Sequence, residues 1–191
     1  GRQVRVPVMP VRLRSVLFVC KGNICRSPFA EYVARKIQQE EVEGDVQFSS
    51  AGLHVLKPIA PPQMAIQVGR EFGVDLDGHR SQSISLNLVK SNDMIVAMEV
   101  WQYEALQSLY PQYHEKLFLL PLLEIAESRA EYGSAAFNIS DPYGGSRNDF
   151  ERCFERIRRC LRSFQAAVKS RAVEHSSEAH SVRSSLPIGS S

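Results

Sequence analysis

The chain has 191 residues, of which 43% are hydrophobic, and a formal net charge of +2. This length fits one domain with a single core and some additional chain. The charge is close to neutral and no basic stripe interleaves with aromatic residues, which argues against a nucleic-acid-binding module. No apolar run reaches the length that a membrane span needs, and the N-terminus lacks the apolar segment of a signal peptide, so a cytoplasmic protein is expected.

The four cysteines lie at positions 20, 25, 153 and 160. Their spacing matches neither a zinc site nor a dense disulfide framework, so free thiols in a reducing compartment are expected. Cys153 and Cys160 fall on one predicted helix, where they are interpreted as buried packing residues.

Short apolar runs alternate with amphipathic segments along the chain. Strands are predicted at residues 15–20, 45–50, 93–98 and 116–120. Helices are predicted at residues 27–43, 61–72, 85–91, 99–109 and 148–169. This alternation predicts a three-layer α/β sandwich, with a parallel sheet, right-handed crossovers and a ligand site beyond the carboxyl ends of the strands.

The predicted elements fill residues 15–169, which are expected to form one domain. Residues 1–14 are basic and interrupted by proline, and are interpreted as a flexible N-terminal extension. Residues 170–191 are polar and rich in serine, which predicts a disordered C-terminal tail.

The first predicted strand runs directly into a short loop and a helix that opens with Pro28. The loop contains Gly22 and Asn23, the residue types that best tolerate left-handed backbone angles. Such a turn directs successive backbone N–H groups into one concavity, to which the helix N-terminus adds its positive end. The sequence therefore predicts an anion site with a cysteine at one rim and an arginine at the other.

Each residue type at this site has a chemical role. Cys20, near converging amides and a guanidinium, should favour the thiolate form. Arg26 can hold two oxygens of a tetrahedral oxyanion in bidentate fashion, and Ser27 can donate a hydrogen bond to the thiolate. A thiolate below a clamped phosphoryl group is arranged for in-line covalent phosphoryl transfer. The alternative is that Cys20 is a small buried core residue, which the motif around it disfavours.

The segment from Phe18 to Pro28, with Cys20 and Arg26 as a Cys-x5-Arg signature, resembles the low-molecular-weight protein tyrosine phosphatase family, in its bacterial form. The resemblance covers residues 15–169 and implies a four-stranded sheet in the order 2-1-3-4. It also implies that the enzyme hydrolyses phosphotyrosine monoesters through a phosphocysteine intermediate. The loop residues that it implies for substrate binding are Lys21, Gly22, Asn23, Ile24, Cys25 and Ser27.

Cysteine phosphatase chemistry also needs a proton donor on a loop that reaches the phosphate. Asp141, followed by Pro142, Tyr143 and two glycines, resembles the general-acid loop of the family and precedes the last helix in the same way. Asp141 is therefore assigned as the catalytic acid, and Tyr143 as an aromatic wall for a phenyl ring. Taken alone, an Asp-Pro dipeptide is more often an ordinary turn.

The resemblance also implies a polar network that holds the phosphate loop in shape. Ser50 and His79 match supporting positions of that network, together with Asn23. Leu56 matches the position of a specificity-determining residue on the far wall. Glu99 stands where relatives often carry aspartate, and no role is assigned to it.

Cys25 lies close enough to Cys20 in this tight loop for a disulfide that would mask the nucleophile. A reversible redox guard is therefore one hypothesis for this pair.

Three other functions fit part of the pattern. Arsenate reductases of this fold pass a disulfide outward through further cysteines. Residues 52–152 contain no cysteine, which disfavours this function. A non-catalytic phosphotyrosine-binding module would be expected to lack the catalytic cysteine, arginine or aspartate. This chain keeps Cys20, Arg26 and Asp141, which favours an active enzyme. Phosphoarginine phosphatases resemble this chain but tend to carry Thr where this chain has Ile24. The isoleucine favours an aryl phosphate as substrate.

No metal and no other cofactor is expected, because Arg26 and the loop amides supply the positive charge. The resemblance implies a phosphotyrosine-containing protein as substrate, by analogy a bacterial tyrosine kinase, and a monomeric enzyme without nucleic-acid or membrane partners.

Overall fold

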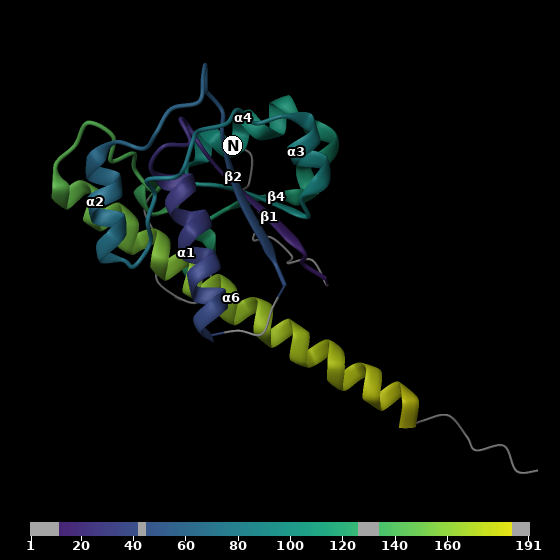
Figure 1. Ribbon diagram of the computed structural model, residues 1–191. Coiled ribbons are helices and arrows are strands. Elements are labelled where there is room, and N and C mark those ends of the chain that lie inside the picture. The colour runs from purple at the N-terminus through teal and green to yellow at the C-terminus, as the bar shows by residue number, and fades with distance from the viewer. Residues whose placement is uncertain (1–11, 42–44, 126–133, 185–191) are drawn as a thin grey trace, which may run out of the picture.

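The structure is a computed structural model that describes residues 12–41, 45–125 and 134–184. Its centre is one parallel sheet in the order β2-β1-β3-β4 (Figure 1), as the resemblance implied. The strands are β1 (Ser15–Cys20), β2 (Gln47–Gly52), β3 (Met94–Ala97) and β4 (Leu117–Leu119). Strand β1 lies between β2 and β3. Its last residue, Cys20, therefore lies near the middle of the sheet edge formed by the carboxyl ends of the strands.

Helices cover both faces of this sheet. The helices of the part of the chain described are α1 (Arg26–Glu41), α2 (Gln63–Glu71), α3 (Leu86–Ser91), α4 (Val100–Leu109), α5 (Pro121–Ile125) and α6 (Arg147–Ser184), with 3-10 turns η1 (Pro111–Lys116) and η2 (Ser134–Phe137). Figure 1 shows α1, α2 and α6 on one side of the sheet and α3 and α4 on the other. The predicted three-layer α/β architecture is confirmed.

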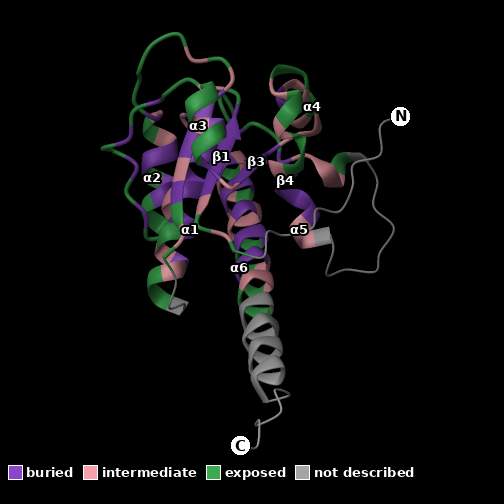
Figure 2. Cartoon of the chain, turned by 90° about the vertical axis from the view of Figure 1, so that its right-hand side faces the viewer, coloured by how far each residue is buried: buried purple, intermediate pink, exposed green. Residues whose placement is uncertain are grey.

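Side chains of β1 point alternately into two separate cores, as a strand buried on both faces requires. Val16 and Phe18 belong to the core below α1, α2 and α6. Leu17 and Val19 belong to the core below α3 and α4. Figure 2 shows the strands as the most continuously buried part of the chain. The phosphate-binding loop therefore starts from a rigid element.

Strand β2 begins and ends two residues later than the sequence predicted, because its pairing with β1 continues to the pair Cys20–Gly52. The serine, alanine and glycine at its end resemble a turn in sequence, yet they complete this ladder. At Gly52 an added Cβ would lie 3.0 Å from the backbone N of Asn23, so glycine lets β2 approach the loop closely.

Helix α6 also differs from the prediction. It continues to Ser184, although a disordered tail was expected from residue 170. Residues 147–184 contain neither glycine nor proline, so nothing in the local sequence breaks the helix. The other limits of the predicted domains stay predictions, and residues 1–11 and 185–191 lie outside the described residues. None of the described helices has the length and apolar character of a membrane span.

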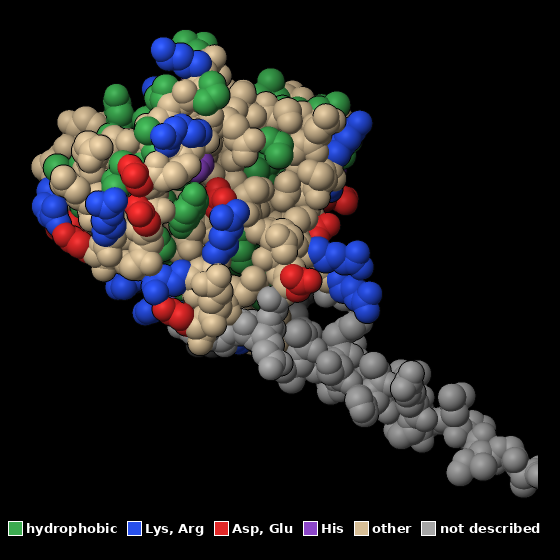
Figure 3. All heavy atoms as spheres, viewed as in Figure 1, with side chains coloured by type: hydrophobic (Ala, Val, Ile, Leu, Met, Phe, Trp, Pro, Cys, Tyr) green, Lys and Arg blue, Asp and Glu red, His purple; other side chains and the backbone are tan. Residues whose placement is uncertain are grey.

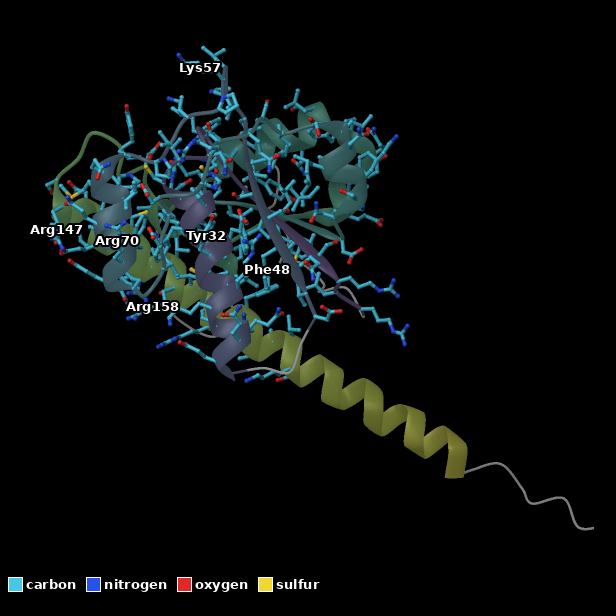
Figure 4. The ribbon with its side chains drawn as sticks, viewed as in Figure 1. Tyr32, Phe48, Lys57, Arg70, Arg147 and Arg158 are labelled. Carbon is cyan, nitrogen blue, oxygen red and sulfur yellow. The ribbon has the colours of Figure 1, made fainter. Side chains whose placement is uncertain are left out.

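Contacts between α2 and α6 position the start of α6. Arg147 forms an ion pair with Glu71 of α2, and the Arg158 guanidinium lies 5.1 Å above the centre of the Phe72 ring. Figure 4 shows Arg147 next to Arg70 at the end of α2, and Figure 3 shows acidic and basic side chains interspersed over this face. Asp141 lies a few residues before α6. The contacts between α2 and α6 therefore fix the C-terminal end of the loop that carries Asp141.

Candidate active site

The segment between β1 and α1 forms a tight loop around the sulfur of Cys20. Helix α1 begins at Arg26, so its positive N-terminal end faces the loop. Asn23 has a φ of +53°, in the left-handed region that asparagine tolerates better than most residues. This conformation turns the backbone N–H of Asn23 back onto the Cys20 Sγ, at 3.3 Å.

The side chain of Asn23 holds the loop in this shape. Its Nδ2 donates to the hydroxyl oxygens of Ser27 and Ser50, at 2.9 Å each. Its Oδ1 accepts the backbone N–H of Gln82 at 2.9 Å, and its buried side chain is 0% exposed. Every hydrogen-bonding group of the amide is therefore used, which favours one loop geometry over others.

Ser27 lies 3.1 Å from the Cys20 sulfur. Because the Ser27 oxygen already accepts a hydrogen bond from Asn23, its own hydrogen is free for the sulfur or for the carbonyl of Ala51 at 3.3 Å. Two donors, Ser27 Oγ–H and the Asn23 N–H, can thus stabilise negative charge on Cys20. Such stabilisation is what a thiolate nucleophile, or a thiolate leaving group, requires.

Ser50 connects the loop to helix α1. Its hydroxyl donates to Glu31 Oε2 at 2.5 Å, and Arg35 pairs with the other oxygen of that carboxylate at 2.5 Å. Burial raises the pKa of Glu31, whereas the Ser50 hydrogen bond and Arg35 oppose the shift. Glu31 was not predicted as a site residue, although it lies one helical turn beyond Ser27 on the loop-facing helix.

Cys25 is buried at the far end of the loop, and burial raises its pKa well above the ordinary value. Cys25 is therefore a neutral thiol, which leaves Cys20 as the nucleophile that the loop can activate. All four cysteines are free thiols. The redox guard between Cys20 and Cys25 stays a prediction.

Arg26 is 1% exposed and is held from two directions. One terminal nitrogen donates to Glu99 Oε2 at 2.6 Å and to the carbonyl of Ile139 at 2.8 Å. The other pairs with Asp141 Oδ2 at 2.8 Å. Burial lowers the pKa of Arg26, but Cys20, Asp141 and Glu99 outweigh it and raise the pKa overall. The guanidinium is thus a permanent cation at the loop.

Asp141 comes to the site from a loop far away in sequence, and it borders two cavities. The cavity above Cys20 has a volume of about 200 Å³ and is also lined by Lys21, Gly22, Ile24, Cys25, His54 and Tyr143. A second cavity, of about 530 Å³, is shared by Asp141 and Tyr143 with residues of α6 such as Arg152 and Cys153. Asp141 therefore stands between the two cavities.

Most of the predicted site residues are therefore brought together. Cys20, Arg26 and Asp141 meet at the loop, and Tyr143 lines its cavity. Leu56 is fully exposed and is not among the residues that line this cavity. Its role in specificity stays a prediction.

Sequence reasoning missed several residues at the site. Glu99 holds Arg26, and its only sequence signal is its place directly after the third strand, where ligand sites of this fold lie. Ile139 contributes through its backbone carbonyl, which carries no residue-specific signal. Gln82 donates its backbone N–H to Asn23 and its side-chain amide to the carbonyl of Ser50. His54 lies in a loop whose course the sequence did not predict.

His79 stabilises the loop from outside. Its Nε2 lies 2.9 Å from the carbonyl of Asn23, and because a carbonyl only accepts, Nε2 must carry the hydrogen. Burial is the main cause that lowers the pKa of His79 below its ordinary 6.5, with Arg80 and Arg35 acting in the same direction and the bond to Asn23 opposing.

We expect this burial to make stability depend on pH. Below about pH 6.5 the unfolded chain binds a proton at His79 more readily than the folded chain does, so the free energy of unfolding falls as pH is lowered. The loss is at most about 1.4 kcal/mol per pH unit. Urea unfolding of the wild type and His79→Asn between about pH 7.5 and 5.5 measures it. The variant should show a flatter dependence, and His114→Asn, at an exposed position, should match the wild type. Equal slopes for all three would contradict the expectation.

Comparison with known proteins identifies the family. The family model described as "Low molecular weight phosphotyrosine protein phosphatase" matches residues 15–174. The chain therefore belongs to the low-molecular-weight phosphotyrosine protein phosphatase family. Among curated proteins it is 32% identical over 147 residues to the "Probable low molecular weight protein-tyrosine-phosphatase EpsP" of Ralstonia nicotianae, covering 77% of this chain and 90% of that protein. It is 30% identical over 159 residues to the phosphatase Wzb of Escherichia coli, covering 83% and 98%.

Solved structures show the same fold with two kinds of named activity. Wzb of Vibrio vulnificus in complex with benzylphosphonate superposes with a TM-score of 0.69 and 29% identity, covering 83% of this chain and 99% of that one. A mutant YwlE arginine phosphatase with a phosphorylated active-site serine superposes with a TM-score of 0.71 and 26% identity, covering 81% and 95%.

Proposed function

We propose that this phosphatase hydrolyses phosphotyrosine in proteins through a phosphocysteine intermediate. The observation that carries the proposal is that Cys20 and Asp141 line one small cavity, while the buried Arg26 pairs with Asp141 at 2.8 Å. A nucleophile, an anion clamp and a proton donor are the three groups that the reaction requires.

In the first step the Cys20 thiolate attacks phosphorus while the bond to the tyrosyl oxygen breaks. Arg26 and the loop amides hold the other phosphoryl oxygens, and protonated Asp141 gives its proton to the leaving phenolate. In the second step water attacks phosphorus, Asp141 accepts a proton from that water, and phosphate leaves as the thiolate is restored. The reaction balances with water as the only other reactant, and no metal is invoked.

Substrate binding must rearrange the ion pair between Arg26 and Asp141. In the structure described here, Asp141 Oδ2 occupies one terminal nitrogen of the guanidinium. A phosphate that takes up this nitrogen displaces the carboxylate, while Glu99 and the Ile139 carbonyl keep the other nitrogen in place. The displaced carboxyl group is then free to face the leaving oxygen, where the first step needs a proton donor.

Replacing Asp141 with asparagine tests its role as the acid. We expect kcat on phosphotyrosine to fall by about 10²–10⁴-fold, the usual contribution of a positioned acid. The loss should grow with the pKa of the leaving group, because poor leaving groups depend most on protonation. Pre-steady-state kinetics on a series of aryl phosphates measures this dependence. If Asp141→Asn hydrolysed phosphotyrosine as fast as the wild type, the assignment would be wrong.

The second candidate is a protein arginine phosphatase, which the similarity to YwlE favours. Ile24 lines the cavity above Cys20, and its apolar side chain suits an aryl group better than a charged guanidinium. We therefore expect phosphotyrosine to be preferred.

The deciding experiment measures phosphate release from matched phosphotyrosine and phosphoarginine peptides, with reductant and without metal. A higher kcat/KM for phosphotyrosine supports the proposal, and a higher value for phosphoarginine overturns the choice of substrate while keeping the mechanism. No release from either peptide by the reduced enzyme would contradict both enzyme proposals and favour a binding module.

The proposal extends to a setting in the cytoplasm, where free thiols persist. The proposed substrate is a tyrosine-phosphorylated protein such as a bacterial tyrosine kinase, and the enzyme is proposed to act as a monomer. Light scattering at several concentrations tests the oligomeric state, and dephosphorylation of an autophosphorylated kinase of the same organism tests the partner.

A further inference from the structure

Besides Tyr143, the cavity above Cys20 is lined by a second aromatic side chain, which the sequence did not predict there. His54 lines this cavity together with Tyr143. Leu56, two residues later, is fully exposed and does not line it. Figure 4 shows the next residue, Lys57, projecting from the molecule at the tip of the same loop. The start of this loop, and not its tip, thus borders the site.

Backbone hydrogen bonds fix His54 beside the nucleophile. The N–H of His54 donates to the carbonyl of Lys21 at 2.8 Å, and the N–H of Leu53 donates to the carbonyl of Cys20 at 3.0 Å. Both acceptors belong to the phosphate loop. The position of the His54 backbone is therefore coupled directly to that of Cys20, whereas the loop tip has no such connection.

Trp101 supports the imidazole of His54. The two ring centres are 5.9 Å apart with an angle of 32° between the ring planes, within the range of favourable ring contacts. The Trp101 indole N–H donates to Glu99 Oε2 at 3.0 Å, the oxygen that also accepts from Arg26. A continuous set of contacts thus connects the ring that borders the cavity with the guanidinium that holds the phosphate.

Building on the proposed function, we propose that His54, supported by Trp101, is a specificity-determining residue that contacts the aryl ring of phosphotyrosine. Tyr143 supplies a second ring to the same cavity. The anion clamp recognises the phosphoryl group of any monoester, so it cannot tell aryl from alkyl phosphates. Two aromatic rings in a cavity of about 200 Å³ favour a planar aromatic group. His54 acts on selectivity and takes no part in bond breaking.

The test compares two competitive inhibitors that share the phosphate subsite, benzylphosphonate with an aryl ring and inorganic phosphate without one. In His54→Ala we expect the Ki of benzylphosphonate to rise by about three- to ten-fold, the usual effect of losing one ring contact. The Ki of phosphate should not change. His54→Phe, which keeps a ring, should retain most of the selectivity, and His114→Ala, at an exposed position far along the sequence, should behave as the wild type.

Fluorescence gives a readout that does not depend on turnover. Trp101 is the sole tryptophan of the chain. Its fluorescence during a titration with benzylphosphonate therefore reports on changes at the adjacent ring of His54. The signal change should be weaker in His54→Ala than in the wild type at equal saturation.

Two outcomes would overturn the inference. One is an unchanged ratio of the two Ki values in His54→Ala, or an equal rise of both, which would indicate a merely structural role. The other is a loss of selectivity in Leu56→Ala but not in His54→Ala. If the wild type failed to hydrolyse phosphotyrosine while its preference for benzylphosphonate still depended on His54, the proposed function would fail and the aromatic wall would stand.

Discussion

Replacing Cys20 with serine is expected to abolish turnover while phosphate binding persists. The hydroxyl of serine is a far weaker nucleophile than a thiolate, and Asp141 is needed as the protonated acid in this step, so it cannot also activate the hydroxyl. Loss of a covalent nucleophile costs about 10⁴-fold or more in kcat. Phosphate release from a phosphotyrosine peptide measures the loss.

Binding is the control for this prediction. Cys20 contributes no positive charge, so Cys20→Ser should still bind inorganic phosphate, and excess phosphate should raise the melting temperature of variant and wild type alike. A matched variant, Cys160→Ser, removes a buried thiol next to Glu124 and away from the loop. It should lower stability without abolishing turnover. Turnover by Cys20→Ser within about ten-fold of the wild type would exclude a phosphocysteine intermediate.

Replacing Arg26 with lysine is expected to damage both binding and catalysis, although the charge is kept. A lysine amine cannot reach Glu99, the Ile139 carbonyl and a phosphate at once, as the planar fork of arginine does. Loss of one donor to transition-state charge costs about 10²–10³-fold, so kcat/KM should fall by about 10²–10³-fold. Steady-state kinetics on phosphotyrosine peptides measures the fall.

Two substitutions of Arg26 separate its role in holding the phosphate from its role in stability. Arg26→Ala leaves the largely buried Glu99 carboxylate without its cation, which should lower the free energy of unfolding by about 3 kcal/mol. Arg26→Lys should lower it less, because a cation remains near Glu99. Arg162→Lys, on the exposed side of α6, serves as the matched control and should change neither kcat/KM nor the free energy of unfolding. A fully active Arg26→Lys enzyme would show that bidentate contact is not required.

The local pattern of residues was sufficient to predict the three-layer α/β class with a parallel sheet, and the family resemblance supplied the strand order. Short continuous apolar runs such as Val16–Val19 are typical of strands buried on both faces, and helical periodicity between them leaves few topologies. The loop from Cys20 to Arg26 could be predicted as an anion site because its chemistry depends on neighbours in sequence: a strand end, a glycine, an asparagine and a helix start. Element ends were less predictable, as at Gly52, where pairing with Cys20 overrides a sequence that resembles a turn.

The sequence by itself thus determined the nucleophile, the anion clamp and, through resemblance, the acid at Asp141. The tertiary structure alone decided what surrounds them. Glu99 reaches Arg26, and His54 at the cavity contacts the ring of Trp101, because β1, β2 and β3 end at the same sheet edge. These contacts join residues that are far apart along the chain, and their distances depend on strand order and loop course. No local periodicity or spacing encodes such distances, so only the folded chain could show which side chains complete the site.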